Sequence, residues 1–502
     1  MTEIAHPDRL AKVEALREAG QNPYPPRGIK ATPIAELREK AGSAEEPGAL
    51  IGERVTIAGR LMGLRDFGKL IFAPVSDRTG RLQVGMKKDR LTEWWPSRKT
   101  LDGGDLVGIS GELGFTQKGE PTIWADEVLL LAKSVASPPE KWHGLADKEQ
   151  RYRRRYVDLW ASEGVLDVFT KRAKVLSEIR RFLEDQGYIE VETPTLHPIA
   201  GGAAAKPFVT HHNSLDADLY LRIAPELYLK RLIVGGMERV FEIARNFRNE
   251  GVSLRHNPEF TMLELYEAQA DYTRMMEITE TMVERLAMAV NGTTKVTFRE
   301  NEYELKAPFQ RKRYPDLFQA ANGCDLFDEE AVRARAKELG IEEHGGYWKL
   351  MNDVFEETVE KDLLGPIFVT DYPTAICPLA KQSPEDPRIA ERFEVFIAGM
   401  ELGNAFTELN DPAEQMRRFE EQVASQDPES PGEVDVDYVQ ALEYGMPPTG
   451  GLGIGIDRLV MVLTGQDSIR DVLLFPAMRK LSSDAEGADA EANDSETSEQ
   501  DA

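Results

Sequence analysis

The sequence predicts a mixed α+β chain in which a small β-barrel precedes a larger domain built on a mostly antiparallel sheet. Five short β-rich runs punctuated by glycines lie between residues 51 and 135. Long helical patterns then alternate with paired strand patterns up to about residue 480. The chain has no N-terminal apolar segment and no long apolar run, so neither a signal peptide nor a membrane span is expected.

The net charge and the cysteine content limit which functions the chain can have. The net charge of −26 argues against indiscriminate nucleic-acid binding, yet residues 51–145 hold fourteen basic against twelve acidic side chains. A local patch in that segment can therefore still bind a polyanion. Cys324 and Cys377 are far apart and have no metal-binding spacing, which fits a reduced, cytoplasmic compartment.

Residues 1–50 form a predicted helical leader, with helices at 8–20 and 33–41. The barrel follows at 51–145, and five strands with glycine turns are typical of a closed barrel such as an OB-fold. Such barrels bind single-stranded nucleic acid through exposed aromatic and basic side chains, and Arg65 and Phe72 are the candidates. The alternative is that Phe72 belongs to the barrel core.

Residues 146–168 are expected to be a linker. Its basic run, residues 151–155, is either a solvated face or a hinge that contacts nucleic-acid phosphates. The larger domain occupies 169–480 and begins with an amphipathic helix at 169–186, which Gly187 ends and a strand to Pro194 follows. We expect residues 270–365 to be a helical insertion, and the acidic tail at 481–502 to be disordered.

Residues 242–267 are the centre of the larger domain. Two alternating flanks predict antiparallel strands joined by a long loop. Leu263 and Leu265 face one way on the second strand, whereas Phe260, Glu264 and Tyr266 face the other. A face that carries carboxylate, aromatic and arginine side chains suits a ligand with an anion, a flat ring and a cation.

A second hairpin is predicted at 392–397 and 400–409, around Ala398-Gly399. A two-residue turn pairs Phe396 with Glu401 and Val395 with Leu402, which puts Glu394 and Glu401 on one face. Two carboxylates so placed repel unless a cation such as Mg²⁺ joins them. Strict alternation puts Asn404, Phe406 and Glu408 on the opposite face from Glu401, so one shared pocket requires a bulge near Gly403.

The final motif has three alternating glycines, at positions 451, 453 and 455, followed by Asp457-Arg458 at the start of an apolar helix. Because glycine has no side chain, these positions leave one face of a strand free of side chains. The spacing is neither a dinucleotide-binding fingerprint nor a phosphate-binding loop with its lysine.

These motifs resemble those of the class II aminoacyl-tRNA synthetases, and the pattern is similar to the bacterial lysyl-tRNA synthetases. The helix at 169–186 with the strand to Pro194 resembles motif 1, Phe-Arg-x-Glu with Phe260 resembles motif 2, and Gly-Leu-Gly-Ile-Gly-Ile-Asp-Arg resembles motif 3. The resemblance covers nearly the whole chain except the tail.

The resemblance implies roles for the candidate residues. Arg248 would grip the ATP α-phosphate, and Arg248 and Arg458 would be the catalytic cations. The implied ATP-binding residues are Arg248, Glu250, His256, Phe260 and Arg458. The implied lysine-binding residues are Gly202, Glu226, Arg248, Glu264, Tyr266, Asn404, Phe406 and Glu408. Glu394 and Glu401 would hold Mg²⁺ bound to ATP, and Arg65 and Phe72 would contact the anticodon.

The implied activity is ligation of L-lysine to tRNA(Lys), with ATP consumed, by a cytoplasmic homodimer formed through motif 1. Three alternatives stay open: an aspartyl- or asparaginyl-tRNA synthetase of the same subclass, a relative that lysylates a protein, and a nucleic-acid-binding protein without activity. Glu264 and Glu408 favour a substrate with a cationic side chain, which argues against the aspartyl- or asparaginyl-tRNA synthetase. The predicted barrel argues against the relative that lysylates a protein.

Overall fold

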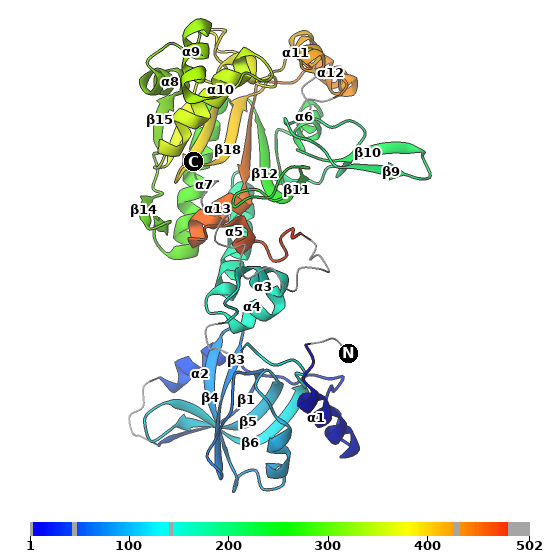
Figure 1. Cartoon of the computed structure of the whole chain (residues 1–502), viewed down its shortest axis with the longest axis vertical. Coiled ribbons are helices and arrows are strands. Elements are labelled where there is room, and N and C mark those ends of the chain that lie inside the picture. The colour runs from blue at the N-terminus through cyan, green and yellow to red at the C-terminus, as the bar shows by residue number, and fades with distance from the viewer. Residues whose placement is uncertain (1–3, 43–47, 140–143, 426–431, 480–502) are drawn as a thin grey trace. The chain divides into compact units, whose positions relative to one another are not determined.

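The computed structural model describes residues 4–42, 48–139, 144–425 and 432–479 (Figure 1). It forms two units, Met1–Leu166 and Asp167–Ala502. The predicted disordered tail lies outside the described residues. None of the described helices combines the length and apolar character that crossing a bilayer requires.

The first unit is a closed barrel, as the sequence predicts. Helices α1 (Pro7–Glu18) and α2 (Ile34–Ala41) precede it. Its strands are β1 (Leu50–Leu61), β2 (Arg65–Asp66), β3 (Leu70–Asp77), β4 (Gly80–Lys87), β5 (Leu106–Phe115) and β6 (Pro121–Ala132). They are ordered β1-β5-β6-β4-β3-β2, and pairing of β1 with β3 closes the barrel.

Alternation of side chains builds the barrel core and explains an unusual proline. Ile71, Ala73 and Val75 of β3 point inward and are buried. Pro74 lies between them, opposite Gln83 of β4. It lacks an N–H, but its carbonyl accepts a 2.8 Å hydrogen bond from the Met62 amide, so the strand tolerates it.

The segment expected as a linker is largely helical, with α3 (Lys148–Arg153) and α4 (Arg155–Ala161). Its basic run is not simply a solvated face. Arg155 is fully buried and lies 2.6 Å from Asp158, which also binds Arg151 at 3.0 Å. Burial of a charged group requires a partner of this kind, and the run therefore stabilises the first unit.

The second unit is built on an eight-stranded sheet. Its order is β15 (Gln310–Arg313), β16 (Ile367–Thr370), β17 (Arg392–Ile397), β18 (Met400–Thr407), β19 (Thr449–Gly455), β12 (Glu259–Ala268), β11 (Arg239–Phe247) and β7 (Ile189–Glu190). The six inner strands are antiparallel, and the two edge strands are parallel to their neighbours. The predicted mostly antiparallel sheet is confirmed.

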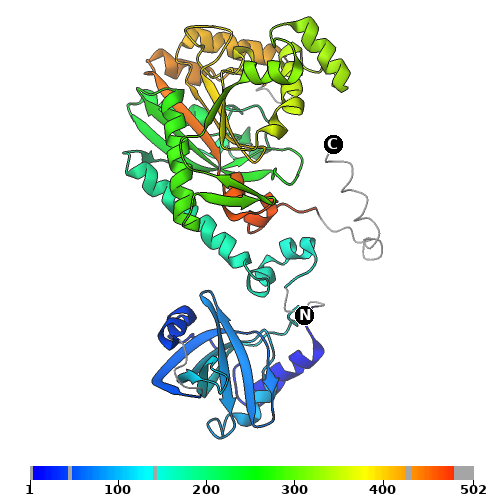
Figure 2. The same ribbon diagram turned by 90° about the vertical axis from the view of Figure 1, so that its left-hand side faces the viewer.

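One face of this sheet packs against helices α5 (Val165–Glu184), α7 (Tyr272–Asn291) and α13 (Ile456–Thr464), as Figure 2 shows for the green α7. The apolar stripe of α5 belongs to this core, because Val175, Ile179 and Leu183 are completely buried within the chain. The stripe therefore leaves no apolar surface for the expected subunit interface, and it gives no support for a dimer.

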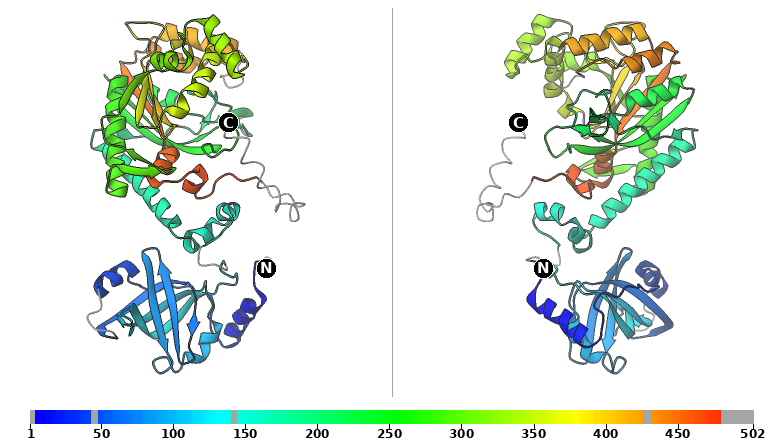
Figure 3. Two further views of the ribbon diagram at one scale, coloured as in Figure 1. Left: turned by 60° about the vertical axis from the view of Figure 1, so that its left-hand side comes forward. Right: turned by 90° about the vertical axis from the view of Figure 1, so that its right-hand side faces the viewer.

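The other face carries α6 (Glu226–Val234), α11 (Pro412–Ser425) and α12 (Val436–Glu443), the last two side by side in Figure 3. A further cluster is formed by α8 (Tyr314–Asn322), α9 (Glu329–Leu339) and α10 (Tyr347–Thr358). The segment 270–365 does not stand apart as an insertion, since α7 lies in the main core and β15 extends the sheet.

Three small elements complete the unit. A three-stranded sheet is formed by β8 (Leu196–His197), β9 (Val209–His212) and β10 (Ala217–Leu221). A hairpin is formed by β13 (Lys295–Phe298) and β14 (Asn301–Glu304), and the short helix α14 (Ile469–Val472) follows α13.

Candidate active site

The floor of the site is the strand pair β11–β12. The strands pair antiparallel along their whole length, with Glu242 opposite Glu264. Leu263 and Leu265 enter the core on one face, whereas Glu264 and Tyr266 line a pocket on the other. The predicted division of faces is confirmed, and it follows from the two-residue period of a strand.

The glycines of β19 keep this pocket open. Gly451 lies opposite Tyr266 and Gly453 opposite Glu264. A Cβ atom at Gly451 would lie 2.6 Å from a ring carbon of Tyr266, and one at Gly453 would lie 3.2 Å from the methyl carbon of Met262. Side chains at these positions would occupy the pocket, which is the physical reason for glycine there.

The second hairpin corrects one predicted register. Phe396 pairs with Glu401 as expected, but Val395 pairs with Gly403, not with Leu402. The extra residue is a bulge directly before Gly403, and it shifts the alternation of the strand by one. Asn404 consequently joins Glu401 on the side of the site, as a shared pocket requires.

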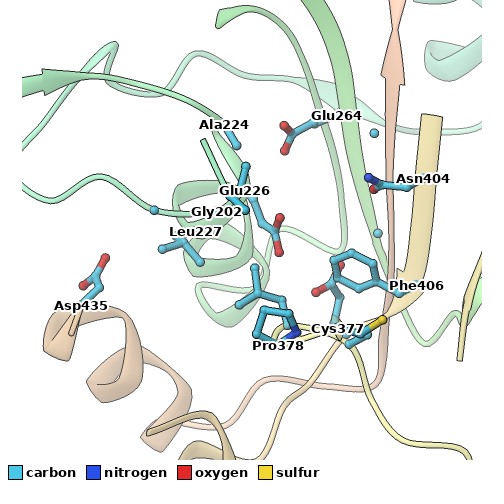
Figure 4. Close-up of a pocket in the computed structure, with 18 of the residues that line it drawn as sticks. Gly202, Ala224, Glu226, Leu227, Glu264, Cys377, Pro378, Asn404, Phe406 and Asp435 are labelled. Carbon is cyan, nitrogen blue, oxygen red and sulfur yellow. The ribbon is translucent and has the colours of Figure 1, made fainter. Parts of the chain in front are cut away.

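A pocket of about 310 Å³ holds all eight residues expected to bind the amino acid. They come from the loop before β9, from α6, from the residue that follows β11, and from strands β12 and β18 with the residue that follows β18. These residues are Gly202, Glu226, Arg248, Glu264, Tyr266, Asn404, Phe406 and Glu408. Figure 4 shows Glu226, Glu264, Asn404 and Phe406 around one space.

Glu264 is a strongly perturbed carboxyl of the pocket. It is only 4% exposed, and burial together with the nearby Glu226 raises its pKa to about 8. The Tyr266 hydroxyl donates a 3.2 Å hydrogen bond to Glu264 Oε2. No basic side chain of the described residues lies within ion-pair distance of Glu264, so it lacks a cation.

Lys230 does not line the pocket but contacts two residues that do, and it was not predicted from the sequence. Its Nζ lies 2.8 Å from Glu226 Oε1 and 2.6 Å from Glu408 Oε2, completely buried. Burial lowers the pKa of Lys230, but the two carboxylates outweigh burial and hold that pKa well above its ordinary value. The i, i+4 spacing of Glu226 and Lys230 on a predicted helix was the available signal for one of these contacts.

A second pocket, of about 130 Å³, adjoins the first. It brings together all five residues expected to bind ATP: Arg248, Glu250, His256, Phe260 and Arg458. Arg255, which the sequence analysis did not select, also lines it, and its guanidinium bonds to the Gly399 carbonyl. Three arginines around one pocket suit a polyanion.

Arg248 has the least satisfied guanidinium of this pocket. It lies over the Phe260 ring with 5.1 Å between its Cζ and the ring centre, and burial lowers its pKa. Its Nε is buried without a hydrogen-bond partner, and no carboxylate of the described residues is within ion-pair distance. The guanidinium therefore remains free to bind an anion.

Arg458 is held at the rim by backbone and side-chain contacts. It donates to the Glu401 carbonyl at 2.7 Å and to His256 Nε2 at 2.9 Å. The preceding Asp457 fixes the start of α13, because it accepts from the Thr261 amide at 2.8 Å and pairs with Arg172 at 2.6 Å. The Asp-Arg sequence thus combines a structural residue with a half-buried cation, which also lies 3.4 Å from Glu401 Oε2.

The proposed metal ligands lie in an acidic environment. Burial raises the pKa of Glu394 to about 7; Arg392 opposes this rise and Glu401 adds to it. Glu360, in a segment where the sequence indicated no chemistry, has its pKa raised to about 8 by burial and by Glu394. Excess carboxylate charge fits a divalent cation, although no cluster of three or more possible ligands occurs within the described residues.

The barrel candidates lie on an aromatic surface. Phe72 is half-buried outside the barrel core, with its ring centre 6.3 Å from that of Phe67 and 6.0 Å from that of Trp124. Arg65 is exposed and donates to Gln83 Oε1 at 2.6 Å. Lys87 lies 4.1 Å above the Trp124 ring.

Comparison with known proteins agrees with this geometry. Residues 147–479 match the family of class II tRNA synthetases (D, K and N), and residues 55–131 match the OB-fold nucleic acid binding domain. The chain is 49% identical over 482 residues to a lysine–tRNA ligase of Magnetococcus marinus, covering 94% of this chain and 96% of the relative.

Two further relatives carry the same name. A lysine–tRNA ligase of Carboxydothermus hydrogenoformans is 50% identical over 479 residues, covering 94% of this chain and 97% of the relative. One of Staphylococcus aureus is 49% identical over 483 residues, covering 94% and 98%. These matches over nearly the full length show that the chain belongs to the class II tRNA synthetases and, among them, to the lysine–tRNA ligase family.

Proposed function

We propose that this chain activates L-lysine with ATP and transfers it to the 3′ end of tRNA(Lys). The observation that carries the proposal is the opposite charge of two adjoining pockets. The amino-acid pocket is lined by three buried carboxyl groups, Glu226, Glu264 and Glu408, and the buried Lys230 contacts the first and the last of them. The adjoining pocket has Arg248, Arg255 and Arg458.

Lysine matches the first pocket in charge. When these three carboxyl groups are ionised, two negative charges remain among them after Lys230 is counted, and L-lysine carries two ammonium groups. Glu226 and Gly202 would take the α-ammonium, whereas Glu264 and Glu408 would take the ε-ammonium. An aspartate side chain would add a third negative charge, and an asparagine amide would leave buried carboxylates unpaired.

ATP matches the second pocket. Arg248 would bind the α-phosphate, with Phe260 stacked on the adenine and Glu250 near its amino group. Arg458 and His256 would bind the outer phosphates. Pre-placed guanidinium groups stabilise charge as it develops on the phosphorus without reorganising, which is the main contribution that such a site makes.

The reaction then needs no side-chain nucleophile. The lysine carboxylate attacks the α-phosphorus in line, the bond to the bridging oxygen breaks, and pyrophosphate leaves. The 3′-hydroxyl of the terminal adenosine of tRNA then attacks the activated carbonyl, loses its proton, and releases AMP. Arg248 lines both pockets and would hold the lysine carboxylate and the α-phosphate together.

Glu394 and Glu401 are the residues that would hold Mg²⁺. Their mutual repulsion supports the proposal, because a divalent cation offsets it; burial is the main cause of the raised Glu394 pKa, and Glu401 adds to it. Bound there, the ion would neutralise phosphate charge. Arg392 and Tyr372 orient Glu394, the latter through a 2.8 Å hydrogen bond from its hydroxyl.

The barrel surface is proposed to bind the anticodon. Phe67 and Phe72 offer rings on which bases can stack, and Arg65 and Lys87 offer positive charge beside them. The half-buried position of Phe72 outside the core supports this role over a purely structural one.

A homodimer is proposed through the segment that follows α5, not through its apolar stripe. Strand β7 is an edge strand of the sheet, and Ile189 on it is 51% exposed. Leu196 and Val209 of the three-stranded sheet are 44% and 61% exposed. Exposed edges with apolar side chains are suited to pairing with another chain. Sedimentation at several concentrations tests this, and a concentration-independent mass of one chain would reject it.

The test of the function is ATP–pyrophosphate exchange with each of the twenty amino acids, followed by charging of tRNA(Lys). Lysine alone is expected to support exchange. Exchange with aspartate or asparagine would identify the neighbouring specificity, and exchange with lysine without charging of tRNA would favour a protein-lysylating enzyme. Absence of exchange with every amino acid would favour a binding protein.

A further inference from the structure

Lys230 is a buried ammonium placed between two carboxylates that come from distant parts of the chain. Glu226 precedes it by one turn of α6, whereas Glu408 follows strand β18. The Nζ–oxygen distances are 2.8 and 2.6 Å, and the Lys230 side chain is completely buried. Burying an ammonium group without partners costs free energy, so the two carboxylates are what allow Lys230 to be buried.

Aromatic rings enclose the remaining sides of the ammonium. Nζ lies 5.8 Å from the ring centre of Phe406 and 5.5 Å from that of Tyr438 on α12. These distances are within the range of cation–π attraction. Four side chains from three elements therefore hold the Lys230 ammonium in place.

Each carboxylate keeps one oxygen away from Lys230. Glu408 binds Lys230 through Oε2, while its buried Oε1 has no hydrogen-bond partner in the described part of the chain. Glu226 binds through Oε1 only. Both residues line the amino-acid pocket. A buried acceptor without a donor is costly, so the free oxygen of Glu408 requires a ligand donor.

We propose that Lys230 is a positioning residue for lysine selection, which holds one oxygen of Glu226 and one of Glu408 so that the other oxygens meet the two ammonium groups of the substrate. This inference rests on the proposed lysine activation. When Glu226, Glu264 and Glu408 are ionised, Lys230 leaves this group of side chains two positive charges short of neutrality, which matches a ligand with two ammonium groups. It does not touch the reacting atoms.

Removing the Lys230 charge changes protonation as well as geometry. The groups that face it are Glu226 on α6, Glu408 after β18 and the Tyr438 hydroxyl on α12; Glu264 and Tyr266 of β12 face Glu226. Burial already raises the pKa of Glu408, and Lys230 opposes that rise. Without Lys230, a proton would neutralise one carboxylate, and a neutral carboxyl no longer attracts an ammonium.

The test is Lys230→Met, which keeps the length of the side chain and removes its charge, assayed by lysine-dependent pyrophosphate exchange. The lysine KM is expected to rise on the order of thirtyfold at pH 7, with the ATP KM within about twofold. The rise should shrink as the pH increases, because a carboxyl whose pKa burial has raised ionises at higher pH.

Lys295→Met is the matched control, since Lys295 pairs with Glu302 at 2.7 Å but is exposed and far along the chain from the site. It should change neither KM. Lys230→Ala supplies a second measurement, in which added ethylammonium occupies the vacated volume. Saturable recovery of the lysine KM by ethylammonium, but not by tetramethylammonium, supports the proposal.

An unchanged lysine KM in Lys230→Met overturns the inference while lysine exchange by the parent enzyme still supports the proposed function. An equal loss for lysine and ATP that is independent of pH and not rescued by ethylammonium also overturns it, because that is the result of a purely structural role. Failure of the parent enzyme to exchange lysine would reject the proposed function first. These outcomes are distinguishable in one set of assays.

Discussion

The two pockets of the second unit differ in how their charges are satisfied, although they share Arg248, Met262, Asn404 and Gly453. The amino-acid pocket has buried carboxyl groups, and burial raises the pKa of Glu264 and of Glu408 there. The nucleotide pocket is basic, and burial lowers the pKa of Arg248 there. Each pocket lacks the charge that its proposed ligand brings. The chain thus keeps two opposite charge imbalances in adjoining pockets.

The largest effect is expected for Arg248, which lines both pockets. Arg248→Ala should abolish adenylate formation, because it removes the group that faces the developing charge; one such contact is worth ~3 kcal/mol or more. Pyrophosphate exchange measures the loss. Arg245→Ala on the same strand is the control, since Arg245 is exposed and pairs only with the exposed Glu259 and the Thr261 hydroxyl. Retained exchange in Arg248→Ala would move the nucleotide site elsewhere.

The next largest effect is expected for a substitution that changes the amino-acid pocket but not the nucleotide pocket. Glu264→Gln should raise the lysine KM on the order of a hundredfold, corresponding to ~3 kcal/mol for the lost charged pairing. The ATP KM should change little, because Glu264 lines only the amino-acid pocket. Steady-state exchange kinetics decide this, with Glu259→Gln as the control. Equal rises for both substrates would show that the pockets are not independent.

A third change leaves both pockets intact. Phe72→Ala should reduce the efficiency of tRNA charging roughly tenfold, because one base–aromatic stack is worth about 1–3 kcal/mol. Lysine-dependent exchange should stay at the parent rate, since the barrel contributes no residue to either pocket. Parallel assays of charging and exchange make the comparison. A matching loss of exchange would mean that Phe72 stabilises the fold instead.

The smallest effect is a dependence on pH. The Glu264 pKa of about 8 leaves this carboxyl mostly protonated at pH 7, whereas an ammonium ligand favours its ionised form. Lysine binding should therefore release a proton below pH 8, and the affinity should rise several-fold between about pH 7 and pH 8 and then level off. Calorimetry in buffers of different ionisation enthalpy measures the proton. Proton uptake on binding would contradict the assignment.

Local pattern alone predicted how the side chains of two strands of the site are arranged. The two-residue period of β12 placed Glu264 and Tyr266 together, opposite Leu263 and Leu265, and three alternating glycines marked an open face. These predictions succeed because strand alternation and glycine clearance depend on near neighbours in the sequence. The family resemblance added roles, and the chain's residues for both substrates do meet in adjoining pockets.

Only the tertiary structure decided which charges meet and which apolar surfaces are covered. The contact between Lys230 and Glu408 joins residues 178 positions apart, and no local pattern encodes it. The burial of the α5 stripe, the bulge at Leu402 and the entry of β15 into the sheet depend equally on distant neighbours. Side-chain period follows from backbone geometry within one element, whereas burial and pairing of charge depend on which elements pack together.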